Sequence, residues 1–252
     1  MSFDLSGPVA AGIVAVGFAP FAGSFLGVVV KRLPEGRPIV LSRSACAACG
    51  TKLGPRDLVP LLSFAASRGR CRHCGAAIPG FHPAIELAAT LIALIAAFAL
   101  DSPEGIAAAC GLGWALLCAA WIDWEHFILP DAIVLPLLLA GLAVNWLRID
   151  DLPADAALGA AVGYSAFAGL AWSYRRLRGH DGLGMGDAKL LAAGGAWLGW
   201  EALPAVVLIA AGIGLAAAGI GWFAGRRVTR MTRLPFGPSL ALAIWAVFLL
   251  QG

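Results

Sequence analysis

The chain has 252 residues, of which 60% are hydrophobic and only 13% are charged. Soluble domains carry about 25% charged residues, so this composition excludes an ordinary water-exposed globular protein. The formal net charge of +3 says little by itself. The positions of the charged residues between the apolar segments are more informative.

Eight apolar segments follow one another along the chain, and a helix needs about 20 apolar residues to cross a bilayer. We expect these segments at 7–30, 83–100, 105–122, 131–147, 155–172, 187–200, 202–224 and 235–251. The sixth segment is the weakest because it is short and rich in glycine. The sequence therefore predicts an all-α polytopic membrane protein with about eight transmembrane helices.

Positive charges between these segments predict the orientation of the chain in the membrane. Every Lys and Arg except Arg148 lies in the loops at 31–82, 173–189 and 225–234. Because cytoplasmic loops are enriched in Lys and Arg, these three loops are expected in the cytoplasm and the N-terminus outside. A signal peptide has a positively charged stretch before its apolar core, whereas the acidic Asp4 precedes the first apolar segment here. This segment is therefore not expected to be a cleaved signal peptide.

The loop at 31–82 contains two matching Cys-x-x-Cys-Gly turns. Twenty-one residues separate the two pairs, which are Cys46 with Cys49 and Cys71 with Cys74. Two such turns present four thiolates to one metal and complete a tetrahedral zinc site, although the spacing slightly exceeds the usual range of about 15–20. Two disulfides are the alternative, and disulfides seldom persist in the reducing cytoplasm. We therefore expect a small cytoplasmic domain that binds structural zinc.

Two aspartates lie at membrane depth, where charged groups are costly and usually functional. Asp123 lies at the cytoplasmic end of the third segment, and Asp187 lies at the cytoplasmic entrance to the sixth. Gly184 and Gly186 remove side-chain bulk before Asp187, which allows an irregular backbone and close approach by a substrate chain. Two carboxyl groups that share a proton can activate water and polarise a carbonyl group, which is aspartic-protease chemistry. The alternative is that each aspartate merely ends its helix in the headgroup layer.

Together these residues resemble those of the type IV prepilin peptidases, also called prepilin leader peptidase/N-methyltransferases. The resemblance covers most of the chain. In chain order it rests on Gly23-Ser24-Phe25-Leu26, Arg32-Leu33-Pro34, the two cysteine turns, Phe81-His82-Pro83-Ala84-Ile85-Glu86-Leu87, the segment around Asp123 and Gly184-Met185-Gly186-Asp187. In that family the two motif aspartates are the catalytic pair, and they correspond here to Asp123 and Asp187.

The resemblance implies that the protein removes a short basic leader from prepilins and from pilin-like secretion subunits, or pseudopilins. The reaction takes place at the cytoplasmic face of the bacterial inner membrane. Members with the cysteine loop also methylate the new N-terminal amine with S-adenosylmethionine. The expected partners are therefore these substrates and the lipid bilayer, and no nucleic acid. Gly27 departs from the family pattern, which usually has Asn after the Gly-Ser-Phe-Leu stretch.

Two further acidic residues are candidates for supporting roles. Glu86 lies in a family motif and is a candidate for substrate binding or methyl transfer, and the alternative is a simple helix-terminus charge. Asp131 follows Pro130, so it either caps the next helix or supports the active site. The expected domains are a first transmembrane helix at 1–30, the zinc-binding loop at 31–82 and an aspartic protease bundle at 83–252.

Two other classes of function remain open on the residues alone. A transporter would use Asp123, Asp131 and Asp187 as a proton relay. Such a relay should reach toward the membrane midplane, whereas these acids cluster at one face. A non-catalytic membrane scaffold would use its zinc loop to bind a partner, which leaves the paired aspartates unexplained.

Overall fold

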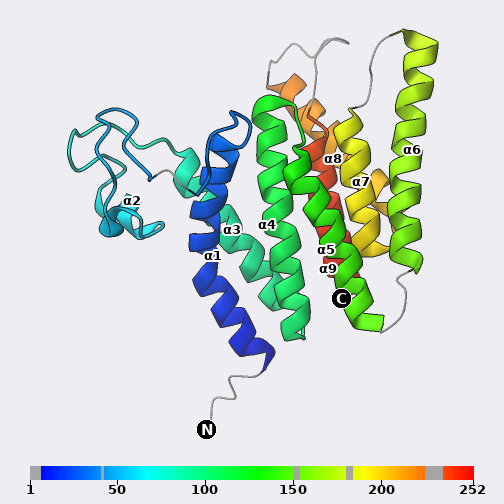
Figure 1. Ribbon diagram of the computed structural model, residues 1–252, viewed down its shortest axis with the longest axis horizontal. Coiled ribbons are helices and arrows are strands. Elements are labelled where there is room, and N and C mark those ends of the chain that lie inside the picture. Colours follow the sequence, from blue (N-terminus) through cyan, green and yellow to red (C-terminus); the bar gives the residue numbers. More distant parts are fainter. Residues whose placement is uncertain (1–6, 41–42, 150–153, 180–183, 225–234) are drawn as a thin grey trace. The chain divides into compact units, whose positions relative to one another are not determined.

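The computed structural model describes residues 7–40, 43–149, 154–179, 184–224 and 235–252. Over these residues the regular elements are helices, apart from two isolated β-bridges in the cysteine loop (Figure 1). Each of the eight predicted apolar segments is helical, with shifted boundaries. The elements are α1 (Pro8–Arg32), η1 (Pro55–Asp57), α2 (Leu62–Ala66), α3 (Phe81–Ala99), α4 (Pro103–His126), α5 (Asp131–Ile149), α6 (Ala154–Arg178), α7 (Met185–Leu198), α8 (Leu203–Phe223) and α9 (Gly237–Gln251).

The helices differ in whether they are long enough to cross a membrane. Among the described helices, α1, α3, α4, α6 and α8 are both long and apolar enough to do so, whereas the apolar helical segments Asp131–Leu147 of α5 and Gly237–Gln251 of α9 are shorter. α7 has 14 residues. At 1.5 Å per residue it spans about 21 Å, which is less than the hydrocarbon core of a bilayer at about 30 Å. The chain is accordingly a multi-pass membrane protein, and α7 is the shortest of the described helices α1 and α3 to α9.

The chain divides into two compact units, 1–114 and 115–252, and the boundary falls within α4. In the first unit α1 and α3 pack side by side (Figure 1). Glycines of α1 make this approach possible, since a Cβ atom on Gly12 would lie 2.9 Å from Cβ of Ala97. Small residues let helices approach closely in a membrane, where van der Waals packing drives their association.

In the second unit α7 packs against α5, α6 and α9. Nearly all of its residues from Asp187 to Leu198 are buried. A Cβ atom on Gly159 of α6 would collide with the backbone of Gly195 of α7, and one on Gly163 would lie 2.7 Å from the carbonyl oxygen of Leu191. The two helices therefore meet backbone to backbone, as small residues at such interfaces permit.

The C-terminal end of α7 is held by α5. The side-chain amide of Asn145 donates to the carbonyl oxygen of Ala196 at 2.9 Å, and the indole N–H of Trp197 donates to the carbonyl oxygen of Leu137 at 2.8 Å. The residue that follows α7 is Gly199, whose φ of +79° lies in the region that favours glycine. Because the last carbonyl groups of a helix lack partners within it, the Asn145 bond also satisfies one of them.

The contact between α6 and α7 predicts opposite effects for two substitutions on α6. Gly159→Ala should destabilise the protein by about 1–3 kcal/mol, the usual cost of overpacking, because the new methyl group meets the backbone of Gly195. Gly169→Ala should be neutral or stabilising by up to about 1 kcal/mol, because alanine favours helices and no described atom beyond the neighbouring backbone of α6 lies within 4 Å of the added carbon. Thermal unfolding in detergent measures both effects. Equal Tm values for the two variants would contradict the close packing.

Candidate active site

The two aspartates singled out in the sequence lie close together in the second unit. Asp123 is in the last turn of α4, and Asp187 is in the first turn of α7. Only 7% of Asp123 and 9% of Asp187 is exposed. Their carboxyl groups are near enough for the charge of Asp123 to act on Asp187. The fold thereby brings together two buried acids that are far apart in the sequence.

Asp123 has a further partner that the sequence analysis missed. The backbone N–H of Gly237, at the start of α9, donates a hydrogen bond to Oδ2 of Asp123 at 3.0 Å. Pro238 follows Gly237, and proline is common at the first positions of helices, so the sequence does carry a signal for a helix start. Nothing in that signal indicates contact with a residue 114 positions earlier.

Two glycines shape the start of α7 before Asp187. Gly184 is the extended N-cap, with φ −74° and ψ 140°, and its N–H bonds the carboxyl group of Asp187. Gly186 is helical, and a Cβ atom on it would lie 3.0 Å from Cβ of Leu129. The backbone at Gly186 is therefore regular, and the space that its missing side chain leaves is taken by the chain's own connection between α4 and α5.

Asp131 begins α5 and forms an ion pair with a lysine of α7. Nζ of Lys189 lies 2.7 Å from Oδ1 and 2.9 Å from Oδ2 of Asp131. The side chains are 34% and 54% exposed, respectively, so solvent screens the pair and its direct contribution to stability is small. Its effect is on position, because Lys189 follows Asp187 by two residues and is tied here to the start of α5.

The end of α4 presents apolar side chains next to Asp123. Phe127 has a left-handed backbone with φ +57°, and its N–H donates to the carbonyl oxygen of Asp123 at 2.9 Å. A residue other than glycine is strained in this conformation, and such strain clusters at functional sites. Trp124, Phe127 and Ile128 are exposed there. At this end of α4 Asp123 is therefore buried, whereas these apolar side chains are exposed together with Glu125 and His126.

A pair of buried, interacting carboxyl groups can divide the work of amide hydrolysis. Two like charges so close together are unfavourable, and one proton shared between the groups relieves the repulsion. The ionised group then accepts a proton from water while the protonated group donates to the carbonyl oxygen of the substrate. The arrangement of Asp123 and Asp187 fits this chemistry.

Glu86 lies in the first unit and is buried, with only 8% exposed. Its Oε2 accepts the N–H of Leu61 at 2.8 Å, and its carboxyl group also bonds the side chain of Ser24. A Cβ atom on Gly23 would lie 2.6 Å from Cα of Glu86. The motif segments 23–26 and 81–87 therefore meet around Glu86, which also holds the connection to the cysteine loop at Leu61.

The four cysteines of the loop form one cluster. The Sγ atoms of Cys46, Cys49, Cys71 and Cys74 all lie within 4.8 Å of one another, and those of Cys46 and Cys74 are 3.9 Å apart. Four sulfur atoms held tetrahedrally at about 2.3 Å from zinc are about 3.8 Å from one another. The cysteines are free in the structure, and their spacing fits a four-thiolate metal site.

Each cysteine pair lies in a tight turn that ends with glycine, as predicted. The N–H of Gly50 donates to the carbonyl oxygen of Cys46 at 2.8 Å, and that of Gly75 donates to Cys71 at 2.9 Å. The two glycines have φ of +70° and +73°, in the region that glycine adopts at little cost. Hydrogen bonds with the side chain and backbone of Thr51 lower the pKa of Cys49 to about 6, which favours the thiolate at this cysteine.

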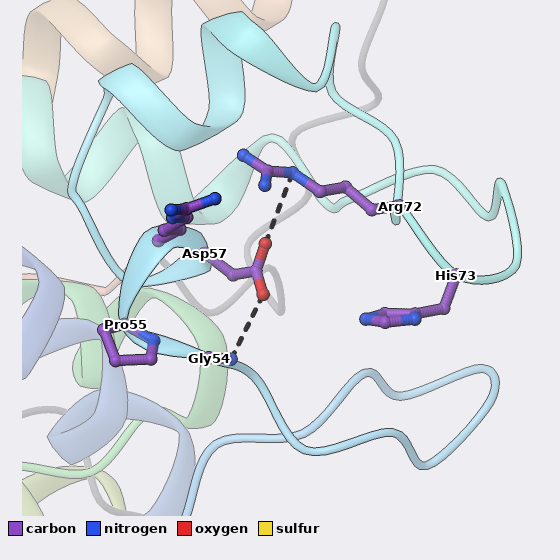
Figure 2. Close-up of a pocket in the computed structure, with 6 residues that line it drawn as sticks. Gly54, Pro55, Asp57, Arg72 and His73 are labelled. Carbon is purple, nitrogen blue, oxygen red and sulfur yellow. Dashed lines mark hydrogen bonds and ion pairs between the residues drawn. The ribbon is translucent and has the colours of Figure 1, made fainter.

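A pocket of about 430 Å³ lies between η1 and the second cysteine turn (Figure 2). Nε of Arg72 lies 3.4 Å from Oδ1 of Asp57, and the N–H of Gly54 donates to Oδ2 at 3.1 Å. His73 is exposed and lines the same pocket, outside the thiolate cluster. The ion pair thus holds η1 against the second cysteine turn.

Comparison with known proteins covers both units. Residues 18–100 match the bacterial peptidase A24 N-terminal domain, and residues 110–219 match the type IV leader peptidase family. No solved structure matches the chain.

Three similar proteins bear the name prepilin leader peptidase/N-methyltransferase. One from Burkholderia pseudomallei is 46% identical over 87% of this chain and 79% of its own length. One from Aeromonas salmonicida is 38% identical over 92% and 88%, and one from Pseudomonas aeruginosa is 36% identical over 99% and 93%. The matched regions include the cysteine cluster, Glu86 and both aspartates. The chain therefore belongs to the type IV prepilin leader peptidase/N-methyltransferase family.

Proposed function

We propose that this protein is an aspartic endopeptidase that removes the leader from type IV prepilins or pilin-like secretion subunits. The observation that carries the proposal is the meeting of Asp123 and Asp187, which are both buried and interact electrostatically. The names of the relatives from Burkholderia, Aeromonas and Pseudomonas support the substrate class. Of the three acids that a transporter would use, Asp123 and Asp187 interact with each other and Asp131 pairs with Lys189, which favours a local site over a relay.

In the proposed reaction Asp123 and Asp187 begin with one proton between them. The ionised carboxylate takes a proton from a water molecule, and the water oxygen attacks the carbonyl carbon of the scissile peptide bond. The protonated carboxyl group gives its proton to the carbonyl oxygen, which forms a neutral gem-diol. As the C–N bond breaks, the diol returns one proton to the carboxylate, and the protonated carboxyl group gives its proton to the departing nitrogen. Both carboxyl groups finish as they began.

We place eight helices across the bacterial inner membrane, with the N-terminus outside and both aspartates at the cytoplasmic face. The three basic loops support this orientation because Lys and Arg collect on the cytoplasmic side. Large apolar side chains are exposed along α1 and α8, as lipid-facing helices require. Although α7 is short, its neighbours cover it on several sides, and protein-covered segments need not match the thickness of the bilayer.

The proposed orientation predicts the sides on which reporter fusions appear. Fusions after residues 40, 180 and 228 should report the cytoplasm, and fusions near 103 and 151 should report the outside, because the basic loops remain inside. Positions 151, 180 and 228 lie outside the described residues. Paired alkaline phosphatase and fluorescent protein fusions measure both outcomes. An outside result at 180 would place Asp123 and Asp187 on opposite faces and contradict the pairing.

We propose further that residues 31–82 form a zinc-binding domain between the first transmembrane helix at 1–30 and the protease bundle at 83–252. The four cysteines would hold the metal. When bound, zinc supplies a structural cross-link, since four protein ligands leave no open position for water. The tight turns at Gly50 and Gly75 support this proposal because they aim two sulfur atoms from each turn at one point.

The second proposed activity is methylation of the new N-terminal amine with S-adenosylmethionine. Its support is the name shared by the relatives. We propose that Glu86 serves substrate binding or methyl transfer. Its carboxyl group joins α1, α3 and the cysteine domain through Ser24 and Leu61, so it can influence how the domain is presented to a substrate.

One assay tests the proposed function directly. Purified protein is incubated with a prepilin and a labelled methyl donor, and the product is analysed for length and for label at its N-terminus. A shortened and labelled pilin is the expected result. A transporter or a scaffold would leave the prepilin intact, and a mature pilin supplied as a second substrate shows methylation separately from cleavage.

A further inference from the structure

The start of α9 is in direct contact with one of the two active-site acids. The N–H of Gly237 donates to Oδ2 of Asp123 at 3.0 Å, and this bond is buried. A Cβ atom on Gly237 would lie 2.6 Å from that oxygen and 2.9 Å from Cγ of the same carboxyl group. Only glycine therefore lets the backbone approach Asp123 closely enough to donate this bond. α9 lies beyond residue 219, where the family match ends.

The amide of Gly237 is held in place by contacts elsewhere on α9. Ile244 packs on Gly194 of α7, where a Cβ atom would lie 2.9 Å from Cδ1 of Ile244. The ring of Phe248 meets that of Trp197 of α7 edge to face, with centroids 5.8 Å apart. Because α7 also carries Asp187, these contacts fix the donor on Asp123 relative to the second acid.

We propose that Gly237 is a positioning residue of the catalytic pair. The N–H of Gly237 orients the carboxyl plane of Asp123. Because Gly237 has no side chain, Oδ2 of Asp123 can lie next to its backbone. This inference rests on the proposed aspartic-protease function. A carboxyl group has rotational freedom about its side-chain bonds, and a displacement of about 1 Å from the productive geometry can cost about a hundredfold in rate. A single fixed donor removes much of that freedom before substrate arrives.

The central test is Gly237→Ala, assayed on prepilin under conditions where the variant remains folded. We expect kcat to fall at least about a hundredfold while KM changes by less than about threefold, because the lost contact serves the reacting groups rather than substrate binding. Methylation of mature pilin should be retained, since it does not use Asp123. Full kcat in this variant would overturn the inference.

Two matched controls separate positioning from helix packing. Gly214→Ala adds a methyl group between α8 and α9, where it would lie 3.6 Å from Oγ of Ser239 and not against a carboxyl group. Pro238→Ala removes the proline ring next to Gly237 and leaves the Gly237 amide in place. Both should keep kcat within about threefold of the wild type. If either control lost as much kcat as Gly237→Ala, the role of Gly237 would be shown to be structural, and the positioning inference would be overturned.

A double-mutant cycle tests the contact without using activity. Gly237→Ala should lower Tm in the wild-type chain, and it should lower Tm much less when Asp123→Ala has already removed Oδ2 and Cγ, the two atoms that the new methyl group would approach most closely. Equal Tm losses in the two backgrounds would overturn the inference, even if Gly237→Ala folds too poorly to assay. Asp123→Asn is assayed alongside. If that variant cleaves normally, the proposed function fails. If it is inactive while Gly237→Ala is fully active, only the positioning role fails.

Discussion

Asp123→Asn and Asp187→Asn should each lower prepilin cleavage at least about a thousandfold, which corresponds to roughly 4 kcal/mol of transition-state stabilisation. Hydrolysis needs water made nucleophilic and a carbonyl polarised at the same moment. Neither acid does both from one position, and asparagine keeps the size of the side chain but cannot take a proton. The double variant should be scarcely worse than either single one, because members of one catalytic unit are not additive.

Control substitutions make this result specific to the pair. Asp155→Asn changes an exposed acid in the first turn of α6 and should leave cleavage within about threefold of the wild type, as surface changes away from the site do. Asp131→Asn weakens the ion pair with Lys189 and should have an intermediate effect through the position of α7. A well-folded Asp123→Asn protein that cleaves at a near wild-type rate would refute the catalytic assignment.

The same aspartate variants should still methylate a mature pilin supplied already cut. Methyl transfer needs a neutral amine held in line with the donor methyl group, and it has no use for a water-activating pair. The experiment gives each variant both intact prepilin and mature pilin with labelled S-adenosylmethionine. A variant that neither cleaves nor methylates, yet unfolds at the wild-type Tm, would show that the two activities are not separable.

Replacement of one cysteine of the cluster should remove the metal from the purified protein. Wild-type protein should carry about one zinc per chain, and Cys46→Ser or Cys71→Ser should carry almost none. Structural zinc binds small modules with apparent free energies of about 10–16 kcal/mol, and much of that free energy is also folding free energy. The loop at 31–82 should therefore become sensitive to limited proteolysis in these variants.

Cys110→Ala is the matched control for the metal, because this buried thiol of α4 lies outside the cluster. It should retain zinc in full. Because zinc ligands must be deprotonated, the wild-type metal should stay bound at neutral pH and be released as the pH falls. Elemental analysis and thiol titration measure both effects. Protein without zinc, in which all four loop thiols react freely, would refute the metal site.

Local sequence patterns determined the helices and the cysteine turns. An apolar run long enough for a bilayer satisfies its backbone hydrogen bonds within itself, so α1 and α8 could be predicted without knowledge of their neighbours. The turns at Gly50 and Gly75 are equally local, since each closes over a few residues and needs only a positive φ. Local patterns also indicated that Asp123 and Asp187 matter, because charge is costly in an apolar segment.

Contacts between distant segments were decided only by the tertiary structure. Gly237 bonds Asp123 across 114 residues, and Lys189 pairs with Asp131 across 58. Neither contact leaves a periodic or compositional signal, because each depends on how α9, α7 and α5 pack. Gly186 shows the same limit: glycine there suggested room for a substrate, and Leu129 fills the space. A missing side chain reveals that something approaches closely, but only the packing of the helices determines what it is.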